Sequence, residues 1–180
     1  MPIPAKAHAA RVPAFMLCLS LCLGGPAAYA ADLSQSDELP PNEMQTLGAA
    51  ASRALIHQSG SHNQASINQQ GSAQLAHIVQ SGINGSARHD QEGQGNVALS
   101  LQSGIRDLVT INQVGQDNLA ITTQAGQDNE IRIMQYGDDN IAAAGQSGRN
   151  NQTLIEQYTD GALANVWLSG DGGTAHFIQQ

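Results

Sequence analysis

Small or apolar residues alternate with polar ones from about residue 54 onward, and the alternation restarts every eleven residues. Since neighbouring side chains of an extended strand point to opposite faces, alternate residues share one face. In the segment 118–124, the residues on one such face are Asn118, Ala120, Thr122 and Gln124. Four residues, 125–128, then lead to the next such segment, and their glycine and aspartate suit a tight turn. Each unit therefore predicts a strand of about seven residues followed by a turn.

Three positions of the unit carry the same residue type in nearly every copy. Glutamine recurs at Gln58, Gln69, Gln80, Gln91, Gln102, Gln113, Gln124, Gln135, Gln146, Gln157 and Gln179. Glycine follows two residues later, at Gly60, Gly71, Gly82, Gly93, Gly104, Gly115, Gly126, Gly137, Gly148 and Gly170. Asparagine follows five residues after the glutamine, at Asn63, Asn96, Asn118, Asn129, Asn140 and Asn151. Polar residues in a disordered segment would not recur at the same positions in every unit. We therefore infer that the repeat determines the architecture of the protein.

The period of eleven is compatible with a helix as well as with strands. A right-handed coiled coil has the same period. A helix would, however, hold glycine in every unit, and each helical glycine costs about 1 kcal/mol relative to alanine. We therefore predict an all-β fold, a two-sheet cross-β solenoid of stacked 22-residue strand–turn–strand rungs with two eleven-residue units each.

Stacking of the rungs would give the amide side chains a structural role. Equivalent residues of successive rungs would lie about 4.8 Å apart, the spacing of paired strands. A buried amide needs partners for its donor and its acceptor, and a column of identical amides supplies both. No apolar cap precedes the first unit, so its strand edges would stay open. Because open edges recruit further strands, we expect the chain to polymerise end to end.

Residues 1–30 differ from the repeat. They combine Lys6 and Arg11 with an apolar run at 14–23 and the motif Ala28-Tyr29-Ala30. The run is short for a transmembrane helix, and the whole arrangement is typical of a secretory signal peptide. Both cysteines would leave with this segment, so we expect a mature chain without disulfides.

The mature chain would have two parts, a flexible N-terminal segment at 31–53 and the solenoid at 54–180. Five basic residues would then face fifteen acidic ones, a net charge of −10. Nucleic-acid binding needs a basic footprint, which this chain lacks. No other apolar run is long enough to span a membrane.

Patterns that indicate catalysis or metal binding are weak. The histidines after residue 54 fall at different positions of the repeat, and no H-E-x-x-H or paired-cysteine spacing occurs. We therefore expect no enzyme activity, metal or cofactor. Asp117, Asp128 and Asp139 recur in the turns, where aspartate is ordinary turn chemistry. Calcium binding and gatekeeping against aggregation are the alternatives for these three residues.

The unit Q-x-G-x-x-N-x-A-x-x-x-Q, as in 113–124, resembles the repeat of curlins, which are secreted bacterial amyloid subunits. The resemblance covers roughly residues 54–180. It implies extracellular curli fibres with roles in biofilm matrix and adhesion, and export through the curli outer-membrane secretion machinery. The partners that it implies are the major curlin subunit and other copies of this chain.

Two features are similar to the minor curlin subunit, which nucleates polymerisation of the major one. One is the opening segment Ala54-Leu-Ile-His-Gln-Ser-Gly, and the other is the loss of motif residues near the end, as at Thr159 and Leu168. The minor subunit usually ends in a basic segment, whereas residues 161–180 lack lysine and arginine, so attachment through this segment stays open. A major fibre subunit, or a monomeric ligand- or ice-binding β-solenoid, remains as the alternative.

Overall fold

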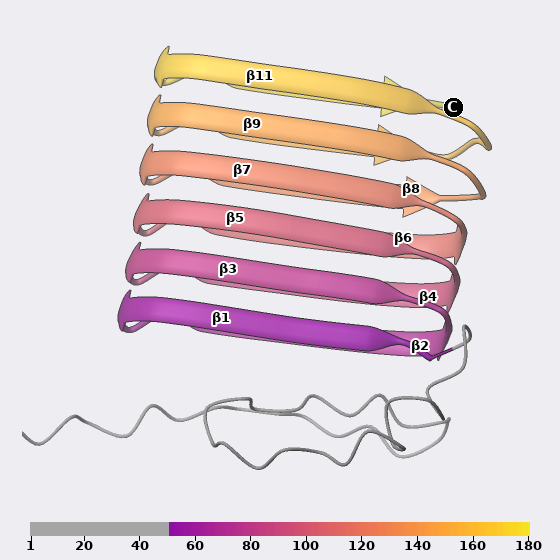
Figure 1. Ribbon diagram of the computed structural model, residues 1–180. Helices are drawn as coiled ribbons and strands as arrows, with labels where there is room; N and C mark the ends of the chain where they lie inside the picture. The colour runs from indigo at the N-terminus through magenta and orange to yellow at the C-terminus, as the bar shows by residue number, and fades with distance from the viewer. Residues whose placement is uncertain (1–50) are drawn as a thin grey trace, which may run out of the picture.

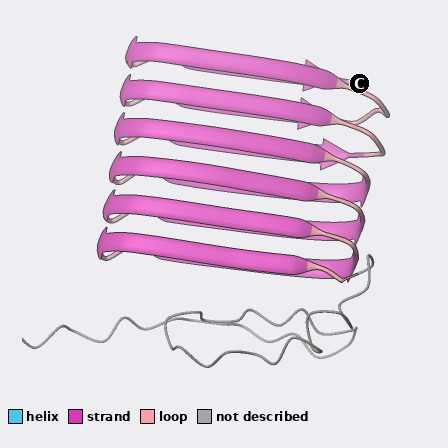
Figure 2. Cartoon of the chain, viewed as in Figure 1, coloured by secondary structure: helices cyan, strands magenta, loops and turns pink. Residues whose placement is uncertain are grey.

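The computed structural model describes residues 51–180, which form strands joined by short connections (Figures 1 and 2). The predicted signal peptide and most of the predicted flexible segment lie outside the described residues. The first strand begins at Arg53. Within residues 51–180 there is no helix long and apolar enough to cross a membrane.

The strands alternate between two six-stranded sheets, here called the odd sheet and the even sheet. The odd sheet consists of β1 (Arg53–Ser61), β3 (Leu75–Ile83), β5 (Val97–Ile105), β7 (Leu119–Gln127), β9 (Ile141–Arg149) and β11 (Leu163–Asp171). The even sheet consists of β2 (Gln64–Ser72), β4 (Ser86–Gln94), β6 (Leu108–Gln116), β8 (Glu130–Tyr136), β10 (Gln152–Gln157) and β12 (Thr174–Gln179). One odd and one even strand form a rung, and the rungs stack in chain order (Figure 1).

All neighbouring strands are parallel, and their register pairs residues that are 22 positions apart. Gln80 on β3, for example, lies opposite Gln102 on β5. The hydrogen bonds continue through the connections, where the amide of Asp117 donates to the carbonyl of Gln94 at 2.9 Å. This arrangement confirms the predicted two-sheet solenoid with rungs of 22 residues.

The strands are longer than the predicted seven residues, and most contain nine. The extra residues include the motif glycine: Gly126 on β7 pairs in register with Gly104 on one side and Gly148 on the other. Because this backbone pairs on both sides, the sheet continues past the glycine. The connection between β7 and β8 then consists of Asp128 and Asn129 only.

The core is a thin layer between the two sheets. It is filled by small or branched apolar side chains, among them Ile78, Ala98, Ile111, Ala120, Ile131, Ile133, Ala142 and Ile155. In the end rungs the equivalent residues Ile56 and Phe177 are only partly buried, because a neighbouring rung covers them on one side alone. Buried amide side chains complete the interior, which explains how a chain with few large apolar residues forms a core.

Candidate functional site in the stacked amide columns

The motif glutamines form two columns through the interior, one in each sheet. In the even sheet each Nε2 donates to the Oε1 of the next glutamine at 2.8–2.9 Å, along the series Gln69, Gln91, Gln113, Gln135, Gln157. In the odd sheet the donor–acceptor distances are 2.5–3.0 Å, along the series Gln58, Gln80, Gln102, Gln124, Gln146. Every bond in both columns runs in the same direction, from the N-terminal rung towards the C-terminal rung.

Each motif glutamine from Gln91 to Gln157 also ties its sheet to the opposite one. The Nε2 of Gln113 on β6 donates to the carbonyl of Val97 on β5 at 3.0 Å. The Nε2 of Gln124 on β7 donates in the same way to the carbonyl of Leu108 on β6. Both N–H groups and the oxygen of such an amide are therefore used, which is what a buried carboxamide requires.

The motif asparagines form further columns at the two edges where the chain reverses. The backbone N and the Nδ2 of Asn118 both donate to the Oδ1 of Asn96 at 3.1 Å. The Nδ2 of Asn118 also donates to the carbonyl of Gly137 at 2.7 Å. Asn129 and Asn151 repeat this arrangement at the other edge. The asparagines thus bond one chain reversal to the next. The Oδ1 of Asn63 accepts a hydrogen bond from the backbone amide of Gly85, and the Oδ1 of Asn140 accepts one from the backbone amide of Ala162. Each bond joins the asparagine to the following rung.

Most of the motif glycines occupy positions where a larger residue would overlap the next rung. Their φ angles are positive, for example 130° at Gly115. A Cβ on Gly115 would overlap the carbonyl oxygen of Gly137 in the rung above. The same overlap with the next glycine of the column applies to Gly60, Gly71, Gly82, Gly93, Gly104, Gly126 and Gly148. At Gly137 the neighbours are Thr159 and Asp160, and a Cβ on Gly170 would meet nothing within 4 Å.

A left-handed residue in every connection was not predicted from the sequence. It lies four positions after the motif glutamine, or after Leu168 in the last unit, and its φ is between 53° and 72°. Eight of the eleven residues at this position are asparagine, aspartate or glycine: Asn84, Gly95, Asp117, Asp128, Asp139, Asn150, Gly161 and Gly172. These types tolerate left-handed geometry, so their recurrence was the available signal.

The three turn aspartates do not form one cluster. Asp117 and Asp139 follow even strands, whereas Asp128 follows an odd strand and lies at the opposite edge. Arg106 binds Asp128 with two hydrogen bonds of 2.6 Å, and this contact holds the pKa of the Asp128 carboxyl below its usual value. Among residues 51–180, no three histidine, cysteine or acidic side chains are grouped as metal ligands would be.

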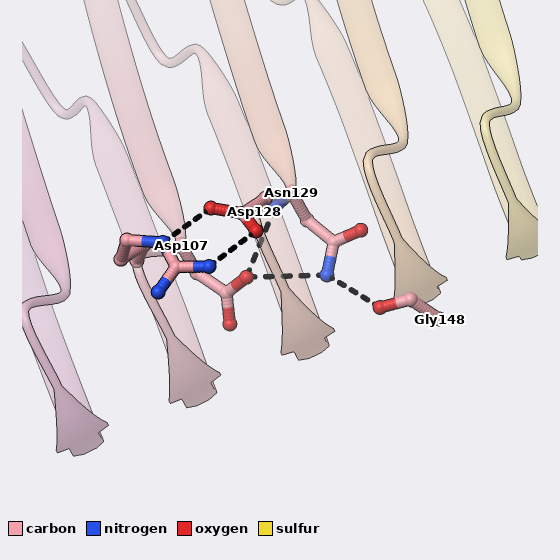
Figure 3. A network of polar contacts seen from close by, with 5 residues as sticks. Asp107, Asp128, Asn129 and Gly148 are labelled. Atoms are coloured by element: carbon pink, nitrogen blue, oxygen red, sulfur yellow. Dashed lines mark hydrogen bonds and ion pairs between the residues drawn. The ribbon is translucent and has the colours of Figure 1, made fainter.

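Asp107 occupies an asparagine position and is buried (Figure 3). Its Oδ1 accepts from the backbone N and the Nδ2 of Asn129, both at 3.1 Å. Its Oδ2 lacks a hydrogen-bond partner within the described chain. At equivalent positions an amide nitrogen stands there and donates to a glycine carbonyl, as from Asn129 to Gly148 (Figure 3). Burial raises the pKa of the Asp107 carboxyl, because it removes the charged form from water, and the hydrogen bonds from Asn129 offset only part of this effect.

A second polar exception lies in the apolar layer. The Nε2 of His89 shares a hydrogen bond of 2.6 Å with the Oγ of Ser100, which accepts from Thr122 at 2.8 Å. Burial, with a smaller contribution from the charge of His77, lowers the pKa of His89 to about 3. His89 is therefore neutral at neutral pH. Sequence analysis missed this cluster, although 89, 100 and 122 stand where other units carry isoleucine or valine.

The two ends of the solenoid differ in how their amide columns stop. At the first rung, the Oε1 of Gln69 is buried and has no partner among residues 51–180. At the last rung, Leu168 takes the place of a glutamine in the odd sheet. The Nε2 of Gln146 donates to the Oγ1 of Thr153 at 2.9 Å instead of to a further glutamine. In the even sheet Gln179 stands opposite Gln157, but its buried Oε1 has no hydrogen-bond partner among residues 51–180.

These features define a class of protein, a parallel two-sheet β-solenoid whose rungs are joined by amide columns and whose terminal strands have no further strand beside them within residues 51–180. A comparison with protein families matches the curlin associated repeat at residues 106–137 and again at 126–158. The chain thus carries curlin associated repeats across residues 106–158, which supports its assignment to the curlin family. A comparison with curated proteins gave no match.

Proposed function

We propose that this chain is a secreted structural subunit of curli fibres at the cell surface, and that it is the minor subunit, which nucleates the major curlin. The curlin repeat supports the structural role, and fibres of this kind serve adhesion and biofilm matrix. Copies of this chain and the major subunit would add end to end, after export through the curli secretion machinery.

The observation that carries this proposal is the open first rung. In the even-sheet column, each glutamine from Gln91 to Gln157 accepts a hydrogen bond at its Oε1 from the preceding rung. The Oε1 of Gln69 is buried in the same orientation and lacks this donor within the described residues. Both β1 and β2 also pair on one side only. A rung docked beneath them would supply strand partners and an amide donor together.

The end formed by β1 and β2 is the better template of the two. A rung added beyond β11 would find Leu168 instead of a glutamine, so the odd-sheet column would stop there. We therefore infer that the chain nucleates the major subunit from its first rung. The incomplete last rung also supports the minor-subunit assignment over the major one.

A seeding assay tests the proposal. A small fraction of the purified protein is added to fresh major curlin, and amyloid-dye fluorescence is followed. We expect a shortened lag. Gln69→Leu should lengthen the lag again, whereas Gln179→Leu, in the same column at the other end, should not. An unchanged lag with rapid fibrillation of this chain alone would indicate a major subunit. A soluble monomer without fibrils would indicate a monomeric solenoid.

A further inference from the structure

The outer faces of the two sheets differ in chemistry. The outward side chains at the first, third and fifth residue of each strand make eighteen positions per sheet. In the odd sheet twelve of them are apolar: Leu55, Leu75, Val79, Val97, Leu99, Leu101, Leu119, Ile121, Ile141, Ala143, Leu163 and Trp167. In the even sheet four are apolar: Leu108, Met134, Leu154 and Ile178. Consecutive eleven-residue units belong to opposite sheets. An alignment of single units therefore mixes the two faces and does not show this difference.

Seven of these twelve apolar side chains are exposed to solvent, and the other five are half-buried. Leu101 is 48% exposed, Ile141 43% and Trp167 67%. Trp167 lies flat against the neighbouring strand, because its indole occupies the space that a Cβ on Gly145 would need. Monomeric proteins rarely leave a continuous apolar surface of this extent uncovered.

We propose that the outer face of the odd sheet is a lateral docking surface for the odd sheet of a second copy of this chain. The contact is isologous, because the same face serves both partners across a two-fold axis. It joins solenoids side by side and is independent of end-to-end stacking. Rows of leucine, isoleucine and valine on the two faces would interdigitate as in a dry sheet-to-sheet interface.

The size of the face suits such a pair. Six strands at about 4.8 Å and nine residues at about 3.3 Å give a face of about 29 by 30 Å. Two such faces would bury about 1,700 Å² in total, which is within the usual range for a specific, stable interface.

The charge distribution selects the odd sheet for this contact. Its eighteen outward positions include no acidic residue, and Arg53 is the only lysine or arginine among them. The even sheet carries Asp90, Glu130 and Glu156 outward, with Arg88 and Arg132 paired to Asp90 and Glu130. An even-to-even contact would have to desolvate these charges, whereas an odd-to-odd contact keeps the acidic residues in water.

The test replaces three neighbouring apolar residues on one face. The variant Leu99→Thr, Ile121→Thr, Leu101→Thr removes apolar surface from the odd sheet and keeps high β propensity. The matched control Leu108→Thr, Met134→Thr, Leu154→Thr does the same on the even sheet. Mass per length of the fibres, from scanning transmission electron microscopy, counts the chains in each six-rung rise of about 29 Å.

We expect two chains per rise for the wild type and the control, and one for the odd-sheet variant. One chain per rise in the wild type, or two in the odd-sheet variant, would overturn the proposal. Dye fluorescence reports end stacking separately, so failure of fibre formation does not count as failure of lateral pairing. If no fibres form, sedimentation decides: a β-rich dimer that the odd-sheet variant breaks supports the proposal, and a wild-type monomer contradicts it. A monomer that floats with phosphatidylcholine vesicles would assign the face to lipid instead.

Discussion

The interior rungs and the last rung carry the same motif residues in different surroundings. Gly115 lies beneath the backbone of Gly137, whereas Gly170 has open space at the corresponding place. Gln113 bonds to the glutamines on both sides, whereas Gln179 has a buried oxygen without a partner in the described part of the chain. A motif residue thus stabilises the fold through its contact with the equivalent residue 22 positions away. Its contribution to stability should be small at the end rung, where that equivalent residue is missing.

The largest expected effect comes from the glycine column. Gly115→Ala would force a methyl group into the carbonyl of Gly137 and would also strain a backbone with φ of 130°. We expect a loss of more than about 4 kcal/mol, because overpacking and backbone strain combine. Gly170→Ala has the strain alone, with φ of 99°, and should cost about 1 kcal/mol. Urea unfolding of the unassembled monomer measures both, because end-to-end assembly would cover Gly170, and equal losses would show that the stacked contact is unimportant.

The glutamine column gives an intermediate effect. Gln113→Leu would leave the Nε2 of Gln91 and the Oε1 of Gln135 buried without this partner. Each buried polar group that loses its partner costs about 1–3 kcal/mol, so we expect a loss of about 2–5 kcal/mol. Gln179→Leu removes an amide whose oxygen is already unpartnered in the described chain, and it should change stability by less than about 1 kcal/mol. The same urea series compares the two variants, and a larger effect at Gln179 would contradict the column argument.

The sequence predicts the repeating part of this fold well and its exceptions poorly. The period of eleven and the alternation in 118–124 were enough for the sheets, the rungs and the inward residues. The left-handed connection residue was missed because His62, Ala73 and Arg106 do not look like turn residues. The apolar face of the odd sheet was missed because Leu119 and Glu130 belong to adjacent units but to opposite faces. The two faces can be told apart only when the sequence is aligned by the 22-residue rung.

Asp107 shows what the column does with a residue that departs from the motif. Its Oδ2 is buried and has no partner within residues 51–180, at a point where other edges place an amide donor. Asp107→Asn would supply that donor, and the register places the carbonyl of Gly126 to receive it. We expect a gain of about 1–2 kcal/mol at pH 7, the smallest effect of the three.

The pH dependence of that gain follows from the raised pKa of Asp107. A carboxyl with a raised folded pKa keeps its proton in the folded state while the unfolded chain has lost it. The wild type should therefore lose stability as pH rises from the usual aspartate pKa through the raised value, and Asp107→Asn should abolish this loss. His89, whose pKa is lowered to about 3, acts in the opposite sense below pH 6.5, but it is common to both proteins and cancels in their difference.

Urea midpoints at a series of pH values measure the difference in stability between the wild type and Asp107→Asn. The control Asp117→Asn removes an equal charge from an exposed turn, so a parallel gain in both variants would attribute the effect to net charge instead of to the buried oxygen.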